Sequence, residues 1–416
     1  RCTLATPPEG EEGLTFHPQR AVLGVGCARG CPPEELAALV RQALDEAGVA
    51  PGALAAVASI DLKADEPAIL ALARDLDAPL RLFSAAELEA ETPRTTTPSA
   101  VVHAEVGTHG VAENAALAAA GPAARLLCPK RKSARATAAL ALAPEPIVAP
   151  GGRPRGRLAV VGTGPGRADW RTPEASRLIA EAEDLVGYGL YLDLLGPLAA
   201  GKRRHEFALG QEEARCRHAL ELAGAGRRVA LVSSGDPGIY AMAALVFELL
   251  DRPAEAGGVS EAARRAEVVV SPGISALQAA AARIGAPLGH DFCAISLSDL
   301  LTPRETILRR IEAAAAGDFV IAFYNPVSRR RRELMARARE ILLAHRPADT
   351  PVLLASNLGR PAERLVTRRL ADLEVDEIDM LTLVLVGAST TRVLATGDGP
   401  RLYTPRGYAR KRGAQG

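Results

Sequence analysis

Short apolar runs alternate with amphipathic, helix-like stretches along most of the chain, and this alternation predicts an α/β fold. The clearest run is Leu-Ala-Val-Val at residues 158–161, which enters the turn Gly-Thr-Gly-Pro-Gly at residues 162–166. Glycine permits positive φ angles and a close approach of the backbone, so this pattern is typical of a buried strand that ends in a tight loop. Thr172 and Pro173 suit the N-cap and first position of a following helix.

The same pattern predicts a first α/β domain in residues 21–142. Its expected strands lie at residues 21–26, 57–62, 80–84 and 125–128. A first helix is expected to open at residues 32–35 and to stop at Gly48, and further helices are expected at residues 66–76 and 113–120. Residues 1–20 are polar and rich in turn-forming residues, so we expect poor order there. Residues 143–157 contain four prolines and several glycines, a composition that predicts a stiff, extended linker.

The part after the linker is expected to form two α/β subdomains, at residues 158–286 and 287–410, followed by a basic tail at 411–416. The composition changes around residues 287–290, which suggests a junction there. The strands are expected at residues 158–161, 184–188, 228–233, 267–270, 294–297, 319–324, 351–355 and 381–386. The predicted architecture is therefore a small N-terminal α/β domain followed by a two-subdomain α/β unit.

Composition excludes several classes of function. The formal net charge of the 416 residues is +1, so no global charge favours nucleic acid or a membrane surface. No apolar run reaches the roughly 18 residues of a membrane span. Six scattered cysteines are typical of reduced thiols in the cytoplasm. Cys27 and Cys31 lack a second pair or a nearby histidine, so we expect packing thiols and no metal site there.

Three predicted strands end in glycine-bearing loops, at residues 162–166, 235–238 and 272–276. Ligands of open α/β sheets bind beyond the carboxyl ends of strands, where such loops meet. Each loop alone is explained by a tight turn, but three in one domain, with Asp236 and Ser275 among them, favour a shared pocket. Arg167 replaces the third glycine of a dinucleotide fingerprint, and Pro165 lacks an N–H for a pyrophosphate. These differences disfavour a nucleotide-dependent oxidoreductase and indicate a ligand without phosphates.

Residues from about 157 to 410 resemble the tetrapyrrole (class III) S-adenosylmethionine-dependent methyltransferases. The motifs that carry this resemblance are Val-Gly-Thr-Gly-Pro-Gly (161–166), Ser-Gly-Asp-Pro-Gly-Ile-Tyr (234–240), Ser-Pro-Gly-Ile-Ser-Ala (271–276), Tyr-Asn-Pro (324–326) and Thr-Leu-Val-Leu-Val-Gly (382–387). The branch most similar is that of the precorrin-3B C(17)-methyltransferases of cobalamin synthesis. Its distinguishing segments are residues 289–303, 323–329 and 356–360.

Residues 21–142 resemble the C-terminal domain of the CbiG proteins of the same pathway, also found alone as CobE. The matching segments are residues 24–30, 58–67, 83–84 and 129–133. The lactone-opening N-terminal half of CbiG has no counterpart here, which favours metal-free precorrin-3B over its cobalt-bearing counterpart as substrate. In the first domain Asp61, Lys63, Asp65, Glu66 and the basic residues 130–132 are compatible with an anion site or with a solvated loop.

The resemblance implies that S-adenosylmethionine binds between the two subdomains and leaves as S-adenosylhomocysteine. The residues that match cofactor-lining positions are Pro165, Gly235, Asp236, Ile239, Ser275, Ala276, Tyr324, Leu358 and Thr382. Asp236 could alternatively cap the helix that follows it, because aspartate is a favoured N-cap.

The family reaction couples C-methylation at C-17 to ring contraction, giving precorrin-4, and this requires proton transfer and anchoring of carboxylates. The acid–base candidates are His290, Asp291 and Asp299, with a structural histidine as the alternative for His290. The substrate-binding candidates are Ser298, Asn325, Arg329 and Arg360, although an arginine run also suits a solvated helix face. A homodimer that works with other cobalamin-pathway enzymes is expected; a tetrapyrrole-binding scaffold without turnover is the alternative.

Overall fold

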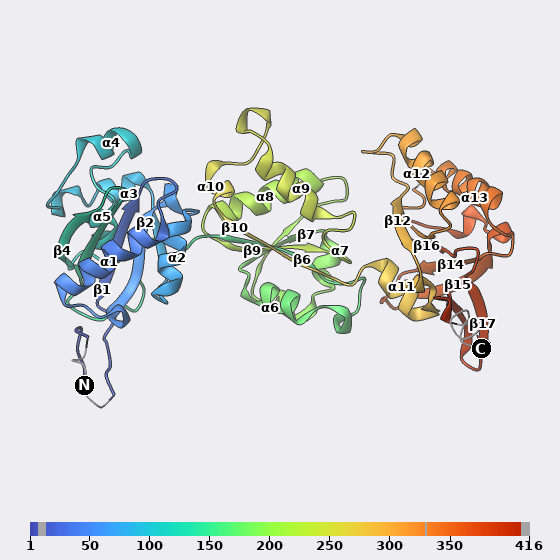
Figure 1. Cartoon of the computed structure of the whole chain (residues 1–416), viewed down its shortest axis with the longest axis horizontal. Helices are drawn as coiled ribbons and strands as arrows, with labels where there is room; N and C mark the ends of the chain where they lie inside the picture. Colours follow the sequence, from blue (N-terminus) through green and yellow to red (C-terminus); the bar gives the residue numbers. More distant parts are fainter. Residues whose placement is uncertain (7–13, 329–330, 409–416) are drawn as a thin grey trace.

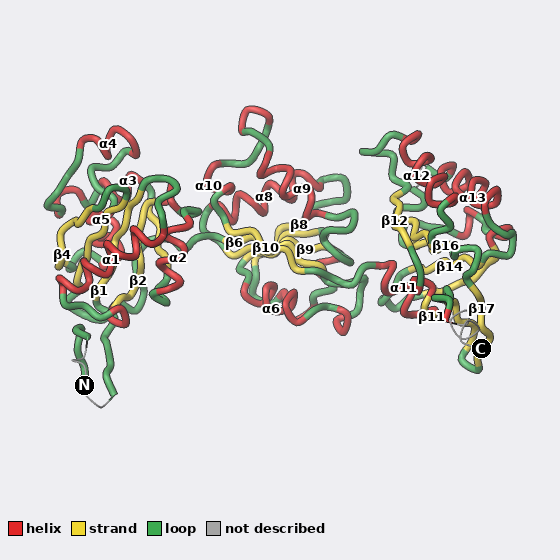
Figure 2. Tube along the Cα trace, viewed as in Figure 1, coloured by secondary structure: helices red, strands yellow, loops and turns green. Residues whose placement is uncertain are grey.

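The computed structural model describes residues 1–6, 14–328 and 331–408. Three sheets with their covering helices follow one another along the long axis of the molecule (Figure 1). Helices lie on the flanks of each sheet, and loops connect the three bodies (Figure 2). The predicted α/β class is confirmed.

The first sheet has five strands in the order β3-β2-β1-β5-β4. Its strands are β1 (Ala21–Cys27), β2 (Leu54–Ile60), β3 (Leu80–Phe83), β4 (Arg125–Lys132) and β5 (Ala136–Leu142). Its helices are α1 (Pro33–Ala47), α2 (Pro67–Asp75), α3 (Ala85–Glu89), α4 (Ala100–Val106) and α5 (Ala112–Ala120). β1, β2 and β3 are parallel, whereas β4 and β5 form an antiparallel hairpin beside β1.

Side chains along β1 point alternately to the two faces of the first sheet, and a hydrophobic cluster packs on each face. Leu23 and Val25 pack with α1 and α2, and Val22 packs with α5. Gly24 allows α5 to lie directly on β1, because a Cβ atom there would meet the carbonyl oxygen of Ala112 at 1.9 Å. The predicted strands and helices are confirmed with small shifts, but β5, α3 and α4 were not predicted.

The segments that flank this module are attached to it. The amide of Thr3 donates to the carbonyl of Phe16 at 3.0 Å, and the carbonyl of Leu4 accepts from the amide of Ala50 at 2.8 Å. The linker pairs with the edge strand β3, where Leu82 and Arg153 exchange two backbone hydrogen bonds. Poor order was expected for residues 1–20, but Thr3, Leu4 and Phe16 form regular backbone hydrogen bonds. Residues 7–13 lie outside the described residues.

The second sheet is parallel throughout, in the order β10-β6-β9-β7-β8. Its strands are β6 (Arg157–Gly162), β7 (Asp184–Gly187), β8 (Arg203–Glu206), β9 (Arg228–Ser233) and β10 (Glu267–Ser271). Its helices are α6 (Pro173–Glu181), α7 (Gly189–Asp193), α8 (Glu212–Gly224), α9 (Met242–Asp251) and α10 (Glu261–Arg264). Leu158 and Val160 pack with α8 and α9, and Ala159 and Val161 pack with α6, so helices cover both faces (Figure 1).

The third sheet is mixed, in the order β12-β13-β16-β14-β15. Its strands are β12 (Phe292–Ser296), β13 (Val320–Tyr324), β14 (Pro351–Ser356), β15 (Arg364–Arg369) and β16 (Thr382–Val386), and a small sheet holds β11 (Gly285–Ala286), β17 (Arg392–Thr396) and β18 (Gly399–Tyr403). Helices α12 (Arg304–Ala316) and α13 (Glu333–His345) cover one face, and α11 (Ala276–Ile284) covers the other. The predicted strands are confirmed, whereas β8, β11, β15, β17 and β18 were not predicted.

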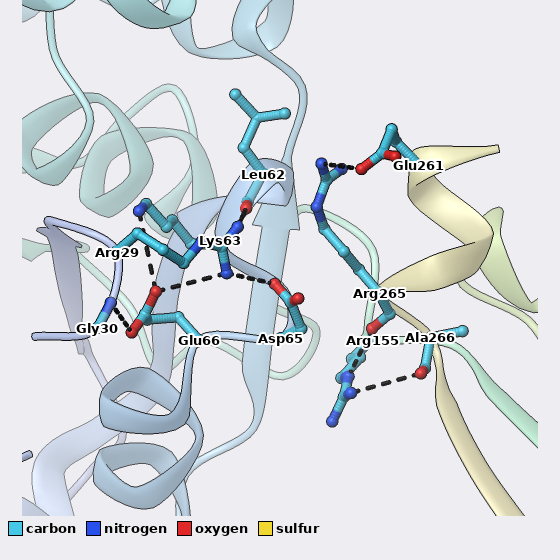
Figure 3. Close-up of polar contacts among 10 residues, drawn as sticks. All are labelled: Arg29, Gly30, Leu62, Lys63, Asp65, Glu66, Arg155, Glu261, Arg265 and Ala266. Carbon is cyan, nitrogen blue, oxygen red and sulfur yellow. Dashed lines mark hydrogen bonds and ion pairs between the residues drawn. The ribbon is translucent and has the colours of Figure 1, made fainter. Parts of the chain in front are cut away.

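The linker connects the first module to the second sheet through its arginines. Arg153 binds the carboxylate of Asp61 at 2.5 Å. Arg155 donates from Nε to the carbonyl of Arg265 at 2.9 Å and from a terminal nitrogen to that of Ala266 at 3.4 Å (Figure 3). The prolines prevent a regular helix or strand in the linker. Its arginines nevertheless bind both the first module and the second domain.

Candidate functional site

The three glycine loops of the second sheet meet at one point. Gly164 and Gly235 exchange backbone hydrogen bonds of 3.2 and 2.9 Å, which join the first loop to the second. A Cβ atom at Gly273 would lie 2.1 Å from the carbonyl oxygen of Gly235, and one at Gly162 would lie 2.8 Å from the amide of Gly273. Only glycines allow this approach, so the predicted convergence of the loops is confirmed.

Asp236 ties two of these loops together. One carboxylate oxygen accepts from the amide of Gly238 at 2.8 Å, and the other accepts from the amide of Gly273 at 3.0 Å. Helix α9 begins only at Met242 with Ala241 as its N-cap, so the alternative that Asp236 caps this helix is wrong. Asp236 is half-buried, and its side chain lies at the carboxyl ends of β9 and β10. Ile239 lies on the same loop, with its amide 3.3 Å from the carbonyl of Asp236.

Tyr324, at the end of β13, connects the loop after β10 to the third sheet. Its hydroxyl lies 2.5 Å from that of Ser275 and accepts from the amide of Leu277 at 3.1 Å. Burial raises the pKa of this phenol, so it stays protonated at neutral pH. Tyr240 adds a second connection, because its hydroxyl donates to the carbonyl of Ala294 at 2.8 Å and its ring lies 5.3 Å from that of Tyr324.

A third connection joins the loop after β6 to the loop after β14. Arg360 donates from Nε to the carbonyl of Pro165 at 3.2 Å. A Cβ atom at Gly166 would lie 2.8 Å from the carbonyl oxygen of Gly359, so this glycine serves contact between subdomains. The Trp170 ring packs beside the same contact, with the guanidinium carbon of Arg283 4.5 Å from its centroid.

Leu358 and Thr382 lie at the same edge of the third sheet as Tyr324. β14 and β16 are antiparallel with Ser356 opposite Thr382, so the end of one strand meets the start of the other. The buried Thr382 hydroxyl lies 2.7 Å from that of Ser356 and donates to Asp379 at 2.6 Å. Leu358 is buried in an apolar cluster against which Ala276 and Tyr324 pack.

A cluster of polar residues follows β12 and β13 at this edge. Arg331 donates to the carboxylate of Asp299 at 3.0 Å and to the hydroxyl of Ser298 at 3.3 Å, with its own side chain only 14% exposed. The Arg331 guanidinium lowers the pKa of Asp299. Asn325 donates to the hydroxyl of Ser296 at 3.1 Å.

This polar cluster borders a cavity of about 500 Å³. The cavity is lined by Asp299, Leu300, Arg304, Ser328, Arg331, Glu333 and Met380. Leu300 and Met380 are exposed, so apolar surface lies next to guanidinium groups. Such a lining suits a large, mostly apolar ligand that carries carboxylates.

His290 and Asp291 do not join the other candidates. They precede β12, whereas Ser298 and Asp299 follow it, so the pair lies at the opposite edge of the sheet. Both side chains are exposed, and the imidazole lies 3.3 Å from the carboxylate of its neighbour. This placement does not support their expected acid–base role. Arg329 lies outside the described residues.

The sequence patterns did not identify Arg331, which binds Asp299, or the cation–π contact between Arg283 and Trp170. Arg331 stood in a run of four arginines, whose pattern does not show which member is buried. Trp170 and Arg283 are far apart in the sequence, and only the fold brings them together. Trp170 is the single tryptophan of the chain, and this was the sequence feature that could have indicated the contact.

The charged residues of the first module are largely used within it. The fully buried Glu66 accepts from the amide of Gly30 at 3.0 Å and lies 3.4 Å from Arg29, which also binds Asp65 at 2.7 Å (Figure 3). Lys130 donates from its ammonium to the carbonyl of Thr97 at 2.9 Å. No catalytic arrangement is evident in this group of charges.

The chain belongs to the tetrapyrrole methylase family. The family described as tetrapyrrole (corrin/porphyrin) methylases matches residues 157–374, and that described as cobalamin synthesis G C-terminus matches residues 21–141. The matched methylase region holds most of the loops described above. Among the described residues, no helix is both long and apolar enough to cross a membrane.

Several known proteins are similar to the methylase part. The cobalamin biosynthesis protein CobIJ of Mycobacterium tuberculosis is 46% identical over 267 residues, which cover 62% of this chain and 50% of that protein. This chain therefore spans about half the length of that relative. A precorrin-3B C(17)-methyltransferase of Sinorhizobium is 46% identical over 61% of this chain and 98% of its own length. A probable cobalt-factor III C(17)-methyltransferase of Salmonella typhimurium is 46% identical over 60% and 99%. The crystal structure of the methyltransferase CobJ is 44% identical with a TM-score of 0.55, covering 60% of this chain and 100% of that one.

Proposed function

We propose that the chain transfers the methyl group of S-adenosylmethionine to C-17 of precorrin-3B, with ring contraction to precorrin-4, in cobalamin biosynthesis. The observation that carries this proposal is the 46% identity to a precorrin-3B C(17)-methyltransferase over 98% of that protein. The contacts of Tyr324, Tyr240 and Arg360 between the two subdomains support it, because they close one site from loops of both.

When bound, S-adenosylmethionine would supply an electrophilic methyl group for C-17 and would leave as S-adenosylhomocysteine. The residues present suit this molecule. Asp236 and Ser275 offer polar groups for its ribose and amino acid ends, and Ala276 and Leu358 offer apolar surface for its adenine. Methyl transfer needs mainly alignment of donor and acceptor, so rigid loops contribute most.

Arg331 is the proposed anchor for a substrate carboxylate, because its buried guanidinium borders the cavity of about 500 Å³. Asp299 is a positioning residue in this proposal. Its lowered pKa keeps the carboxylate ionised at neutral pH, so it orients Arg331 and is a poor proton donor. Ser298 and Asn325 lie beside this pair, and Arg360 keeps the loop after β6 in place.

Calorimetric titration of S-adenosylhomocysteine into the purified chain tests the cofactor site. We expect one site per chain and at least tenfold weaker binding in Asp236→Ala, because that change releases the amides of Gly238 and Gly273. Asp169→Ala is the matched control, since Asp169 pairs with Arg167 at the surface. Binding of NAD in place of S-adenosylhomocysteine would contradict the proposal.

The cobalt-bearing substrate is a second candidate, because the Salmonella relative is equally similar at 46% identity. Turnover assays with precorrin-3B and with its cobalt-bearing counterpart, followed by mass spectrometry of the methylated product, distinguish the two. S-adenosylhomocysteine binding without turnover of either would favour the scaffold.

We further propose a cytoplasmic homodimer. Light scattering on the purified chain measures its mass in solution, and a mass equal to that of one chain would contradict the dimer.

A further inference from the structure

Two histidines and a glutamate meet on the N-terminal module, apart from every residue of the proposed methylase site. Glu89 ends α3, His103 lies in α4, and His109 follows the turn after α4. Gly107 ends α4 with a positive φ of 77°, which turns the chain back on itself. The two imidazole rings consequently stack, with their centroids 4.2 Å apart and an interplanar angle of 29°.

The orientation of His109 is held by two contacts with Glu89. One carboxylate oxygen lies 2.8 Å from Nδ1 of His109, and the other accepts from the backbone amide of His109 at 2.8 Å. Thr92 donates a further hydrogen bond to the same carboxylate at 3.1 Å. These contacts hold the Glu89 carboxylate beside the His109 ring.

The remaining ring nitrogens are available. Among the residues that the structure describes, none forms a hydrogen bond with Nε2 of His109 or with either ring nitrogen of His103. The hydrogen bonds from His109 lower the pKa of Glu89 to about 2, so its carboxylate is charged at neutral pH. The cluster therefore brings a charged carboxylate beside two imidazole rings.

We propose that Glu89, His103 and His109 form a binding site for one divalent transition-metal ion. One potential ligand atom from each residue lies within 4.8 Å of the others, and small side-chain rotations would bring the three to the ~2.0–2.2 Å bonds of zinc. Two nitrogens and one oxygen suit Zn²⁺, Co²⁺ or Ni²⁺ better than Mg²⁺ or Ca²⁺. His103 is exposed, so a fourth position remains open to water.

A bound ion would connect the end of α3 to α4 and to the loop before α5. Glu89 and His103, which are separated by 13 residues of the chain, would then bind the same ion. The site is separate from the methyl-transfer chemistry proposed above, so its test does not depend on that function.

Calorimetric titration of ZnCl₂ into the full chain, free of affinity tags and treated with chelator, is the direct test. We expect one ion per chain. The double variant His103→Ala/His109→Ala loses this binding, and Glu89→Gln weakens it at least tenfold. Circular dichroism of each variant establishes that it is folded, so a loss of binding reports on the ligands.

His218→Gln is the matched control. His218 belongs to another histidine pair near a carboxylate, but its Nε2 lies 2.9 Å from Nδ1 of His205, whose Nε2 lies 3.0 Å from Asp184. These nitrogens are already engaged, so this variant keeps the affinity for zinc.

Titration with Co²⁺ distinguishes the proposed ligands from the thiols of the same module. We expect d–d absorption bands without a thiolate-to-cobalt charge-transfer band, because burial raises the pKa of Cys27 to about 12. Three results would overturn the proposal: no ion bound by the wild-type chain, unchanged binding in the double histidine variant, or binding lost in Cys27→Ser.

Discussion

Burial distinguishes arginines that look alike in the sequence. The side chain of Arg331 is 14% exposed and binds Asp299, whereas that of its neighbour Arg332 is 43% exposed and binds Asp376. A charged group that is mostly shielded from water is screened less by solvent and salt than one at the surface, so its hydrogen bonds contribute more. The function of one arginine in such a run is therefore a property of its surroundings.

Replacing Arg331 by alanine should weaken substrate binding. The change removes charge-assisted hydrogen bonds worth about 1.5–3 kcal/mol, so we expect KM for precorrin-3B to rise about ten- to a hundredfold. S-adenosylhomocysteine affinity, measured by calorimetry, should stay within twofold. Arg337→Ala is the control, because Arg337 is itself exposed and pairs with the exposed Glu340. An equal loss of affinity for both ligands would indicate general disruption instead.

Glu89 should make a pH-dependent contribution to stability. Its folded-state pKa of about 2 lies below the usual 4.5, so the stabilisation is complete above pH 4.5 and is lost as the pH falls towards 2. Glu89→Gln should therefore lower stability at pH 7, and its difference from wild type should shrink below pH 4.5. Chemical unfolding in chelator at several pH values measures this. The exposed Glu105→Gln serves as control, and a difference that grows on acidification would contradict the assignment.

At the scale of elements, two physical reasons explain why sequence patterns did not predict some of the strands. β8 and β15 carry Arg-Arg-His-Glu and Arg-Leu-Val-Thr-Arg-Arg, and both are sheet edges where charged side chains reach water. β5 is rich in alanine, a residue of low strand propensity. Its position between β1 and β4 supplies the pairing that its own sequence does not indicate.

Gly24→Ala should destabilise the contact between β1 and α5. The added methyl would meet the carbonyl oxygen of Ala112 at 1.9 Å and the amide of Ala116 at 2.7 Å, so the helix must move. Overpacking of this kind costs about 1–3 kcal/mol. Hydrogen exchange of the amides in β1 and α5 measures the local loss.

Gly397→Ala is the control for this change, because no atom of the described residues lies within 4 Å of the added atom. Its effect should stay within about 0.5 kcal/mol. Unaltered exchange in Gly24→Ala would show that the module can accommodate the methyl group without loss of packing.

At the scale of the whole molecule, the linker decides how the module and the methylase are joined. Arg153 binds Asp61 of the module, and Arg155 binds carbonyls beside α10 of the methylase. These contacts are partly exposed and individually modest, but together they hold a segment with no regular structure of its own.

Replacing Arg153 and Arg155 by alanine should make the linker more susceptible to proteolysis. Val148 is already 97% exposed, so thermolysin should cut at its N-terminal side severalfold faster in the double variant, as mass spectrometry of the fragments would measure. Arg74→Ala is the control, since Arg74 is itself exposed and pairs with the exposed Asp75. Equal cleavage rates in the double variant and wild type would show that the arginines do not hold the linker.

The sequence alone determined the class of fold, the order of the domains and the loops that meet at the site. These features depend on local patterns, because apolar alternation sets the strands and glycines permit the loops at residues 162–166 and 235–238. Asp236 was identified this way as a candidate, although its bond to the amide of Gly273 was not foreseeable.

Tertiary structure decided which candidates share a site. It placed Asp299 and Arg331 together, put His290 at the opposite end of β12, and stacked His103 on His109. These relations join residues whose contact depends on strand direction, burial and chain reversal, which no local pattern encodes. Electrostatic effects follow the same rule, because the lowered pKa of Glu89 exists only once the fold brings His109 beside it.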